Sequence, residues 1–162
     1  MPVIDVQKDL DNRRLIMTAQ FAAPVERIWQ LYADPRQLEK VWGPPTHPAT
    51  FVDHDLTPGG RMTYFMTAPD GQKYCGFWDV KEVDEPRSFT FEDGFANEDF
   101  TPDTSLPVGI NTYSFSSHDD GTRAVYEAVY PSVEALQQVL DMGVVEGATG
   151  AINQIDAFLA EG

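Results

Sequence analysis

The sequence predicts an α+β domain in which a curved antiparallel sheet of seven strands folds around one long C-terminal helix. Two observations predict it. Short β-type segments and turns alternate from residue 50 to residue 130, and residues 132–160 then keep one amphipathic helical period. A strand series followed by one amphipathic helix is typical of α+β folds, because each element covers the apolar side of the other. A chain of 162 residues is also long enough to bury the core of one domain.

One strand and two short helices are expected near the N-terminus. Residues 14–21 (RLIMTAQF) mix β-branched and apolar residues, which predicts a strand. Pro24 suits the first turn of a helix, and apolar residues then keep helical spacing until Asp34, which precedes a proline. A second short helix is expected over residues 36–41, and residues 1–12 are expected to form a loose tail.

Six further strands are expected between this region and the C-terminal helix. Asp70-Gly71 and Asp120-Gly121 are strong hairpin signals, because both residue types tolerate the positive φ of tight turns. The acidic segment from Glu92 to Asp103 is expected to be a solvated, mobile loop, and a lid anchored by Phe95 and Phe100 stays open as the alternative. The expected strands are 50–56, 61–67, 73–83, 87–95, 109–117 and 122–130.

The C-terminal helix is expected to begin after Ser132, a good N-cap residue, and its apolar side has a gap in the middle. The core-facing positions between Val144 and Ile155 are all small: Gly147, Ala148 and Ala151. Interior glycine costs a helix about 1 kcal/mol relative to alanine, so another effect must favour it. Either the helix approaches the sheet closely, or a cavity lies between them. The candidate walls on the strands are Met62, Tyr64, Met66, Trp78, Phe91, Tyr113 and Phe115.

The composition excludes several classes of partner. The chain has 11 Lys and Arg against 26 Asp and Glu, a formal net charge of −15. Binding to phosphates needs clustered basic side chains, so we expect no nucleic-acid partner and no attraction to an anionic membrane. The sequence has no apolar run of membrane-spanning length and no signal-peptide core, and its single cysteine, Cys75, allows no intramolecular disulfide. These features predict a cytoplasmic protein.

Several stretches, in order along the chain, resemble one protein family. They are residues 23–29 (APVERIW), 42–44 (WGP), 55–61 (DLTPGGR), 69–71 (PDG) and 143–147 (GVVEG). The set is similar to the START-like proteins related to the C-terminal domain of the activator of the heat-shock-protein-90 ATPase. The resemblance covers the chain from about Leu15 to Leu159.

The resemblance implies a helix-grip fold, in which a seven-stranded antiparallel sheet grips the C-terminal helix over a hydrophobic pocket. Helix-grip relatives bind lipids, sterols, polyketides or hormones, and a minority act as cyclases. The resemblance therefore favours a cavity over close packing. This chain has Ala148 where the family pattern has tryptophan, which predicts either a larger pocket or a shift of neighbouring aromatic side chains.

Sequence motifs for metal binding and nucleophilic catalysis are absent. His47, His54 and His118 have no partner at metal-ligand spacing, and HExxH, G-x-S-x-G and phosphate-loop spacings do not occur. We therefore expect no metal, no cofactor and no catalytic nucleophile. Acid–base chemistry stays open, because burial in a cavity tunes the pKa of carboxyl groups and tyrosines. The candidates for it are Tyr64, Tyr74, Tyr113, Glu92 and Glu127.

We expect one domain over residues 1–162 that binds a small hydrophobic or amphipathic molecule between sheet and helix. Two other functions stay open: a cyclase or hydrolase with a pocket Tyr/Glu pair, and a co-chaperone-like module that binds a protein partner. A homodimer through the outer sheet face or a strand edge is compatible with each of them. The residues expected to line the ligand site are Trp42, Met62, Tyr64, Met66, Trp78, Phe91, Tyr113, Leu140, Val144, Ala148 and Ala151.

Overall fold

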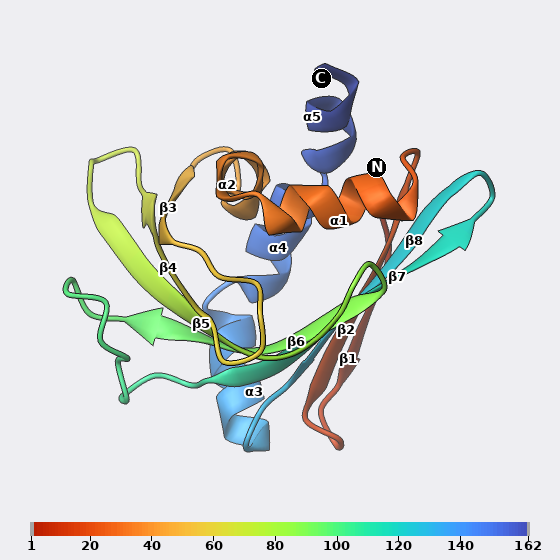
Figure 1. Cartoon of the computed structure of the whole chain (residues 1–162). Coiled ribbons are helices and arrows are strands. Elements are labelled where there is room, and N and C mark those ends of the chain that lie inside the picture. The colour runs from red at the N-terminus through yellow and green to blue at the C-terminus, as the bar shows by residue number, and fades with distance from the viewer. Residues whose placement is uncertain (1, 162) are drawn as a thin grey trace.

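The computed structural model describes residues 2–161, which form one antiparallel sheet and five helices. The sheet has eight described strands in the order β1-β2-β8-β7-β6-β5-β4-β3. It curves, and the helices lie on its concave side (Figure 1), as the sequence predicts for an α+β fold. The strands are β1 (Val3–Asp9), β2 (Arg14–Phe21), β3 (Ala49–Asp53), β4 (Arg61–Thr67), β5 (Lys73–Asp84), β6 (Ser88–Ala96), β7 (Gly109–His118) and β8 (Gly121–Val129).

Strand β1 is the difference from the expected count of seven. It lies in the segment that the sequence analysis assigns to a loose tail, and it pairs antiparallel with β2 at one edge of the sheet. Val3 and Val6 pack against the core, while the residues between them are exposed. In the turn between β1 and β2, Arg13 has a positive φ of 58°, a conformation that glycine usually provides in hairpins. The sequence has no glycine there, so it gives no hairpin signal.

Helices α1 (Val25–Ala33) and α2 (Pro35–Trp42) are the two short helices that the sequence predicts. Asp34 separates them, because it is extended and its Oδ1 accepts a hydrogen bond of 2.9 Å from the Arg36 amide. The proline after it occupies the first turn of α2. The two helices cross the open end of the curved sheet (Figure 1).

The C-terminal helical region runs over residues 133–161 in three consecutive segments rather than one unbroken helix: α3 (Val133–Asp141), α4 (Val144–Ile152) and α5 (Ile155–Glu161). Ser132 caps α3 as predicted, because its Oγ accepts a 3.0 Å hydrogen bond from the Ala135 amide. The first break is at Gly143, with φ 89°, which favours glycine. At the second break, Gln154 Nε2 donates a 2.7 Å hydrogen bond to the Gly43 carbonyl and so ties the helix to the end of α2.

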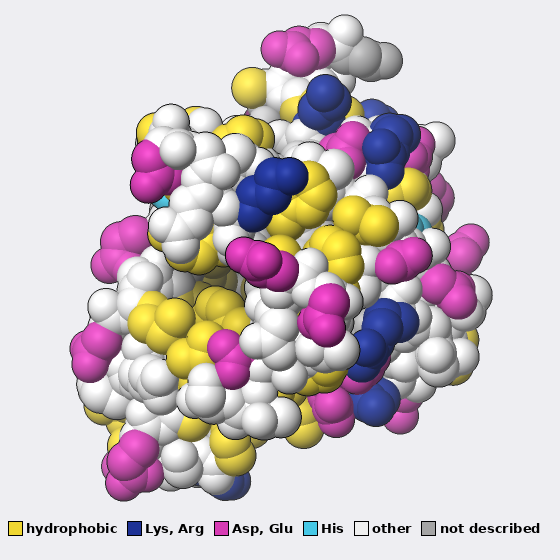
Figure 2. Space-filling view, turned by 90° about the vertical axis from the view of Figure 1, so that its left-hand side faces the viewer, with side chains coloured by type: hydrophobic (Ala, Val, Ile, Leu, Met, Phe, Trp, Pro, Cys, Tyr) yellow, Lys and Arg dark blue, Asp and Glu magenta, His cyan; other side chains and the backbone are white. Residues whose placement is uncertain are grey.

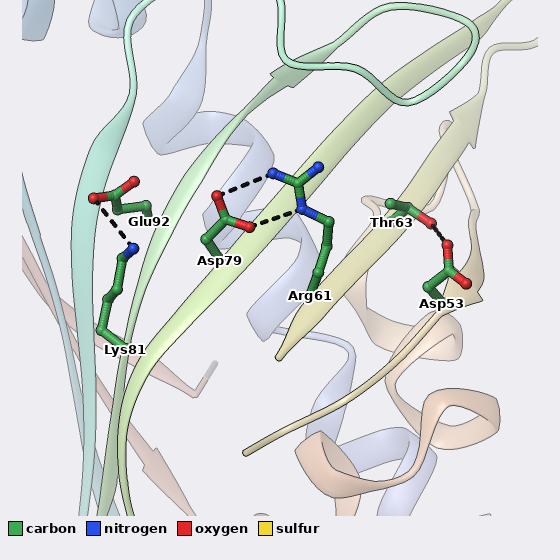
Figure 3. A network of polar contacts seen from close by, with 6 residues as sticks. All are labelled: Asp53, Arg61, Thr63, Asp79, Lys81 and Glu92. Atoms are coloured by element: carbon green, nitrogen blue, oxygen red, sulfur yellow. Dashed lines mark hydrogen bonds and ion pairs between the residues drawn. The ribbon is translucent and has the colours of Figure 1, made fainter. Parts of the chain in front are cut away.

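The two faces of the sheet differ in character. The concave face carries the core, and along β2 alternate residues are buried, as a half-buried strand requires. The convex face carries polar contacts over β3 to β6 (Figure 3), with Arg61 paired to Asp79 and Lys81 paired to Glu92. Among residues 2–161 no helix is long and apolar enough to cross a membrane.

Candidate functional site

A cavity of about 410 Å³ lies between the concave face of the sheet and helices α2 and α4. Its wall is built mainly from aliphatic and aromatic side chains of β2, β4, β6, β7, β8 and the helices. Figure 2 shows a hollow in the molecular surface where hydrophobic side chains gather. A volume of this size is within the range of small-molecule pockets.

Helix α4 contributes small residues to the cavity. Gly147, Ala148 and Ala151 all line it, as does Gly143 at the break before α4. A Cβ atom added to Gly147 would meet no other atom within 4 Å, so this glycine borders open space. The small residues in the middle of the C-terminal helix therefore coincide with the cavity and not with a close helix–sheet contact.

Asp93 of β6 is the acidic residue in the cavity wall. Its Oδ1 accepts a 3.3 Å hydrogen bond from the Tyr64 hydroxyl, and it forms no ion pair within the described part of the chain. Burial raises the pKa of Asp93 to about 7, because the charged form loses hydration that no cation replaces. The site therefore holds a carboxyl group close to its point of half-ionisation at neutral pH.

Two glycines make room for tyrosine rings on either side of Asp93. Gly76 of β5 is the cross-strand partner of Tyr64, and a Cβ at Gly76 would lie 2.4 Å from the hydroxyl of that tyrosine. On the other side, Gly109 of β7 pairs with Asp93, and its Cβ would lie 2.9 Å from the ring of Tyr130. Because neither glycine has a side chain, both rings pack closely against the backbone of the neighbouring strand, near the carboxyl group.

Further tyrosines extend this polar region. The Tyr32 and Tyr126 hydroxyls lie 2.9 Å apart, and Tyr113 packs edge-on against Tyr126 with ring centroids 4.5 Å apart. Burial raises the pKa of all three phenols, so they stay neutral and act as hydrogen-bond donors and acceptors. The indole N–H of Trp42 is buried without a hydrogen-bond partner among the described residues.

Comparison with known families agrees with this architecture. The family model described as Activator of Hsp90 ATPase homolog 1-like protein matches residues 22–160, which is most of the chain. The chain belongs to this family. Its fold and family place it among the START-like proteins, as the sequence motifs indicate.

Solved structures of related proteins share the whole fold. The crystal structure of protein Ms6760 from Mycobacterium smegmatis is 70% identical, with a TM-score of 0.91, over 98% of this chain and 97% of that one. A solution structure of a protein from Arthrobacter aurescens is 41% identical, with a TM-score of 0.94, over 99% and 93% of the two chains. A protein from Staphylococcus epidermidis is 26% identical with a TM-score of 0.84, over 98% and 94%. Among curated proteins, none matches the chain.

In this family member, most of the residues expected to line the ligand site surround the cavity. These are Trp42, Tyr64, Met66, Tyr113, Val144, Ala148 and Ala151. Four expected residues are not part of its lining: Met62, Trp78, Phe91 and Leu140.

The four residues outside the lining lie in packed regions. Trp78 and Phe91 are fully buried and stack on each other with centroids 3.9 Å apart, and Met62 is opposite Trp78 on β4. Leu140 packs in a separate cluster with Leu15 and Leu136. Strand alternation identifies the concave face correctly, but it does not say how far along each strand the cavity extends.

Asp93 is the site residue that sequence reasoning missed. Glu92 and Glu127 are the carboxylates that the sequence suggests for acid–base chemistry. Glu92 points to the convex face and pairs with Lys81 at 3.8 Å (Figure 3), and Glu127 pairs with Arg14 at 3.5 Å. The expectation of a solvated loop over residues 92–103 is therefore wrong at Asp93, which belongs to β6 and lines the cavity. The signal was present, because β6 continues to Ala96 and the alternation of Phe89 and Phe91 carries on to Asp93.

The three histidines lie in different surroundings. His47 lines the cavity, His54 bonds to the Tyr32 carbonyl at 2.9 Å, and His118 at the end of β7 lies 3.2 Å from Asp119. Within residues 2–161, no cluster of three His, Cys, Asp or Glu could hold a metal ion. Burial raises the pKa of the Cys75 thiol, which disfavours the thiolate form that a nucleophile needs.

Proposed function

We propose that this protein binds a small hydrophobic or amphipathic molecule in the cavity between α4 and the sheet. The observation that carries the proposal is the cavity of about 410 Å³, lined mainly by apolar side chains and widened by the small residues of α4. Burial of apolar ligand surface supplies the affinity, and the few polar groups in the wall orient the ligand. The single cysteine, which allows no intramolecular disulfide, supports a cytoplasmic location for this binding.

Native mass spectrometry of freshly purified protein tests the proposal directly, with a co-purified small molecule as the expected result. A second test uses the fluorescent, neutral probe phenylnaphthylamine, which brightens in apolar surroundings. Binding of the probe should be lost in Ala148→Trp, because the indole fills the cavity beside Gly147. The matched control is Glu146→Trp, an exposed position on the same helix, which should bind the probe as the wild type does.

Circular dichroism first establishes that both variants are folded, and the probe affinities are then compared. If Ala148→Trp folds and binds the probe with unchanged affinity, the ligand site is not at this cavity. If the wild type binds neither the probe nor any co-purified molecule, the proposal of a ligand-binding protein fails.

The Tyr64–Asp93 pair favours a second candidate function, an enzyme of the cyclase or hydrolase type. Two polar side chains converge there within hydrogen-bond distance inside the cavity, and a carboxyl group with a pKa near 7 suits general acid–base catalysis. Hydrolysis of naphthyl esters, compared between the wild type and Asp93→Asn, tests it. A turnover that is equal in both proteins contradicts this function.

A protein-binding module has less support. The exposed large apolar side chains are spread over several elements, and Ile4 and Val52, for example, lie on strands at opposite ends of the sheet. Docking surfaces normally gather such residues into one patch.

A further inference from the structure

We propose that the cavity selects lipophilic molecules that carry a protonated amine, and that Asp93 is the residue that binds the ammonium group. This inference rests on the proposed ligand-binding function and names the chemical class of the ligand. It is carried by three features of the wall: the charge balance, the surrounding aromatic rings and the position of the carboxyl group between them.

Within residues 2–161, the acidic group in the cavity wall has no basic partner in that wall. Asp93 lies in the wall, yet no Lys or Arg belongs to the described residues that line the cavity. Its one side-chain partner is the Tyr64 hydroxyl at 3.3 Å, a long contact that leaves the second carboxyl oxygen free to bind another group. A carboxylate withdrawn from water is stable only with a positive partner or full hydrogen bonding, and an ammonium group on the ligand supplies both.

The other groups that face Asp93 cannot replace this cation. Tyr64 faces it from β4, Tyr113 from β7 and Tyr130 from the end of β8, and burial keeps all three phenols neutral. His47, which follows α2, is the histidine among the lining residues, and its Nδ1 bonds to the Thr46 hydroxyl at 2.8 Å. Its ring lies 6.2 Å from that of Tyr74, and it forms no ion pair with Asp93 among residues 2–161. Burial raises the pKa of Asp93 to about 7, so near pH 8 the carboxyl group is mostly ionised and available to an ammonium group.

Aromatic rings surround the same carboxyl group. Seven aromatic side chains line the cavity, and two of them, Tyr64 and Tyr130, lie over the glycines on either side of Asp93. The negative faces of such rings attract an ammonium group, and its alkyl or aryl substituents pack on the same rings. The combination of one carboxylate and several ring faces fits an organic cation better than a neutral lipid.

The net charge of the whole protein is negative, like that of ionised Asp93. The formal net charge of −15 attracts cations and repels anions, so amphipathic carboxylates such as fatty acids are disfavoured both at a distance and beside Asp93. The inference therefore excludes a lipid class that an apolar cavity alone would accept.

Three matched probes test the inference by calorimetry with the whole protein: naphthylmethylamine, naphthylmethanol and naphthoate. They have the same ring system, and they differ in carrying a positive, neutral or negative group. Near pH 8, where Asp93 is mostly ionised, the amine should bind about tenfold or more tightly than the alcohol, and naphthoate should bind most weakly.

Variants assign the preference to one residue. Asp93→Asn should bring the amine down to the affinity of the alcohol while the alcohol keeps its own affinity. Glu92→Gln, which removes the neighbouring carboxylate on the convex face, should change neither affinity. Tyr64→Phe keeps the ring and the carboxyl group, so it should retain the preference for the amine.

The outcomes separate this inference from the function on which it rests. If the wild type binds the alcohol as tightly as the amine, the inference fails and the ligand-binding function stands. If no naphthyl probe binds and phenylnaphthylamine does not bind either, the ligand-binding function itself fails. If Asp93→Asn folds and keeps the amine preference, Asp93 is not the residue that binds the ammonium group.

Discussion

The two faces of strand β6 treat adjacent carboxyl groups in opposite ways. Glu92 points to the convex face, where Lys81 lies 3.8 Å away and both side chains are well exposed (Figure 3). Asp93, the next residue, points into the cavity, where the Tyr64 hydroxyl is its one side-chain partner. One step along a strand therefore separates a solvated surface ion pair from a carboxyl group that no cation in the wall balances.

The comparison shows where this fold concentrates electrostatic free energy. On the convex face water and a basic partner stabilise the carboxylates of Asp79 and Glu92, so these charges contribute little to stability in either direction. On the concave face the charged form of Asp93 is destabilised by lost hydration, and the same free energy is available to a ligand that supplies a cation. Residues on the two faces should therefore respond very differently to neutral substitutions.

The largest expected effect is the pH dependence of stability that Asp93 creates. In the unfolded chain this carboxyl group ionises near its ordinary pKa of 3.8, whereas in the folded protein it holds its proton up to about pH 7. Between these values the folded state binds more protons than the unfolded state, so the free energy of unfolding falls as pH rises. Asp93→Asn removes this loss, and relative to the wild type it should gain about 2–4 kcal/mol between pH 4 and pH 8.

Urea denaturation at a series of pH values measures this difference, and Glu92→Gln is the matched control. The stability of Glu92→Gln should fall between pH 4 and pH 8 as that of the wild type does, because this substitution on the convex face leaves Asp93 in place. Parallel profiles for Asp93→Asn and the wild type would show that Asp93 does not titrate abnormally in the folded protein.

A smaller effect is expected from filling the space that Gly76 leaves for Tyr64. A Cβ at this position would lie 2.4 Å from the tyrosine ring and hydroxyl, so the ring must move away from Asp93. Gly76→Ala should lower the free energy of unfolding by about 1–3 kcal/mol, the usual cost of overpacking. Thermal or urea denaturation measures it.

Gly147→Ala is the matched control for that variant, because its Cβ meets no other atom within 4 Å. Alanine is the better helix former by about 1 kcal/mol, so this variant should be more stable than the wild type. A loss of stability in Gly147→Ala, or none in Gly76→Ala, would contradict the description of these two glycines.

The fold was largely predictable from the sequence, and its two departures have local causes. Strand β1 is hard to predict because its packed residues, Val3 and Val6, are three positions apart, which hides the two-residue period. The exposed Ile4 and Asp5 lie between them, and the pairing with β2 has a register shift there. The breaks in the C-terminal helix were missed because the apolar period continues through Gly143. The break comes where Gly143 takes a positive φ of 89°, a conformation that the apolar period does not reveal.

The sequence predicts which face of the sheet lines the cavity, but not which residues on that face border it. Alternation places Tyr64, Tyr113 and Asp93 on the concave side, and the small residues of α4 indicate the gap. Whether an inward residue borders that gap depends on register across several strands and on where α1 and α2 cover the sheet. Trp78 and Phe91 lie on the correct face, yet they are enclosed by other aromatic rings.

The smallest effect is expected on the convex face, from the ion pair of Arg61 and Asp79. Arg61 donates two hydrogen bonds to Asp79, of 2.8 and 3.1 Å, and its guanidinium lies 5.3 Å from the centre of the Phe77 ring. The side chain is 44% exposed, so water and salt screen the pair. Arg61→Ala should therefore lower the free energy of unfolding by no more than about 1 kcal/mol.

Two further measurements on Arg61→Ala compare the faces of the sheet: the salt dependence of its stability and its affinity for the amine probe. In about 1 M NaCl the difference between Arg61→Ala and the wild type should shrink, because screening removes most of the ion-pair contribution. Affinity for naphthylmethylamine should be unchanged, because Arg61 lies on the opposite side of the sheet from Asp93. A change in that affinity comparable to the effect of Asp93→Asn would mean that charges on the convex face also govern the cavity, and the separation of the two faces would fail.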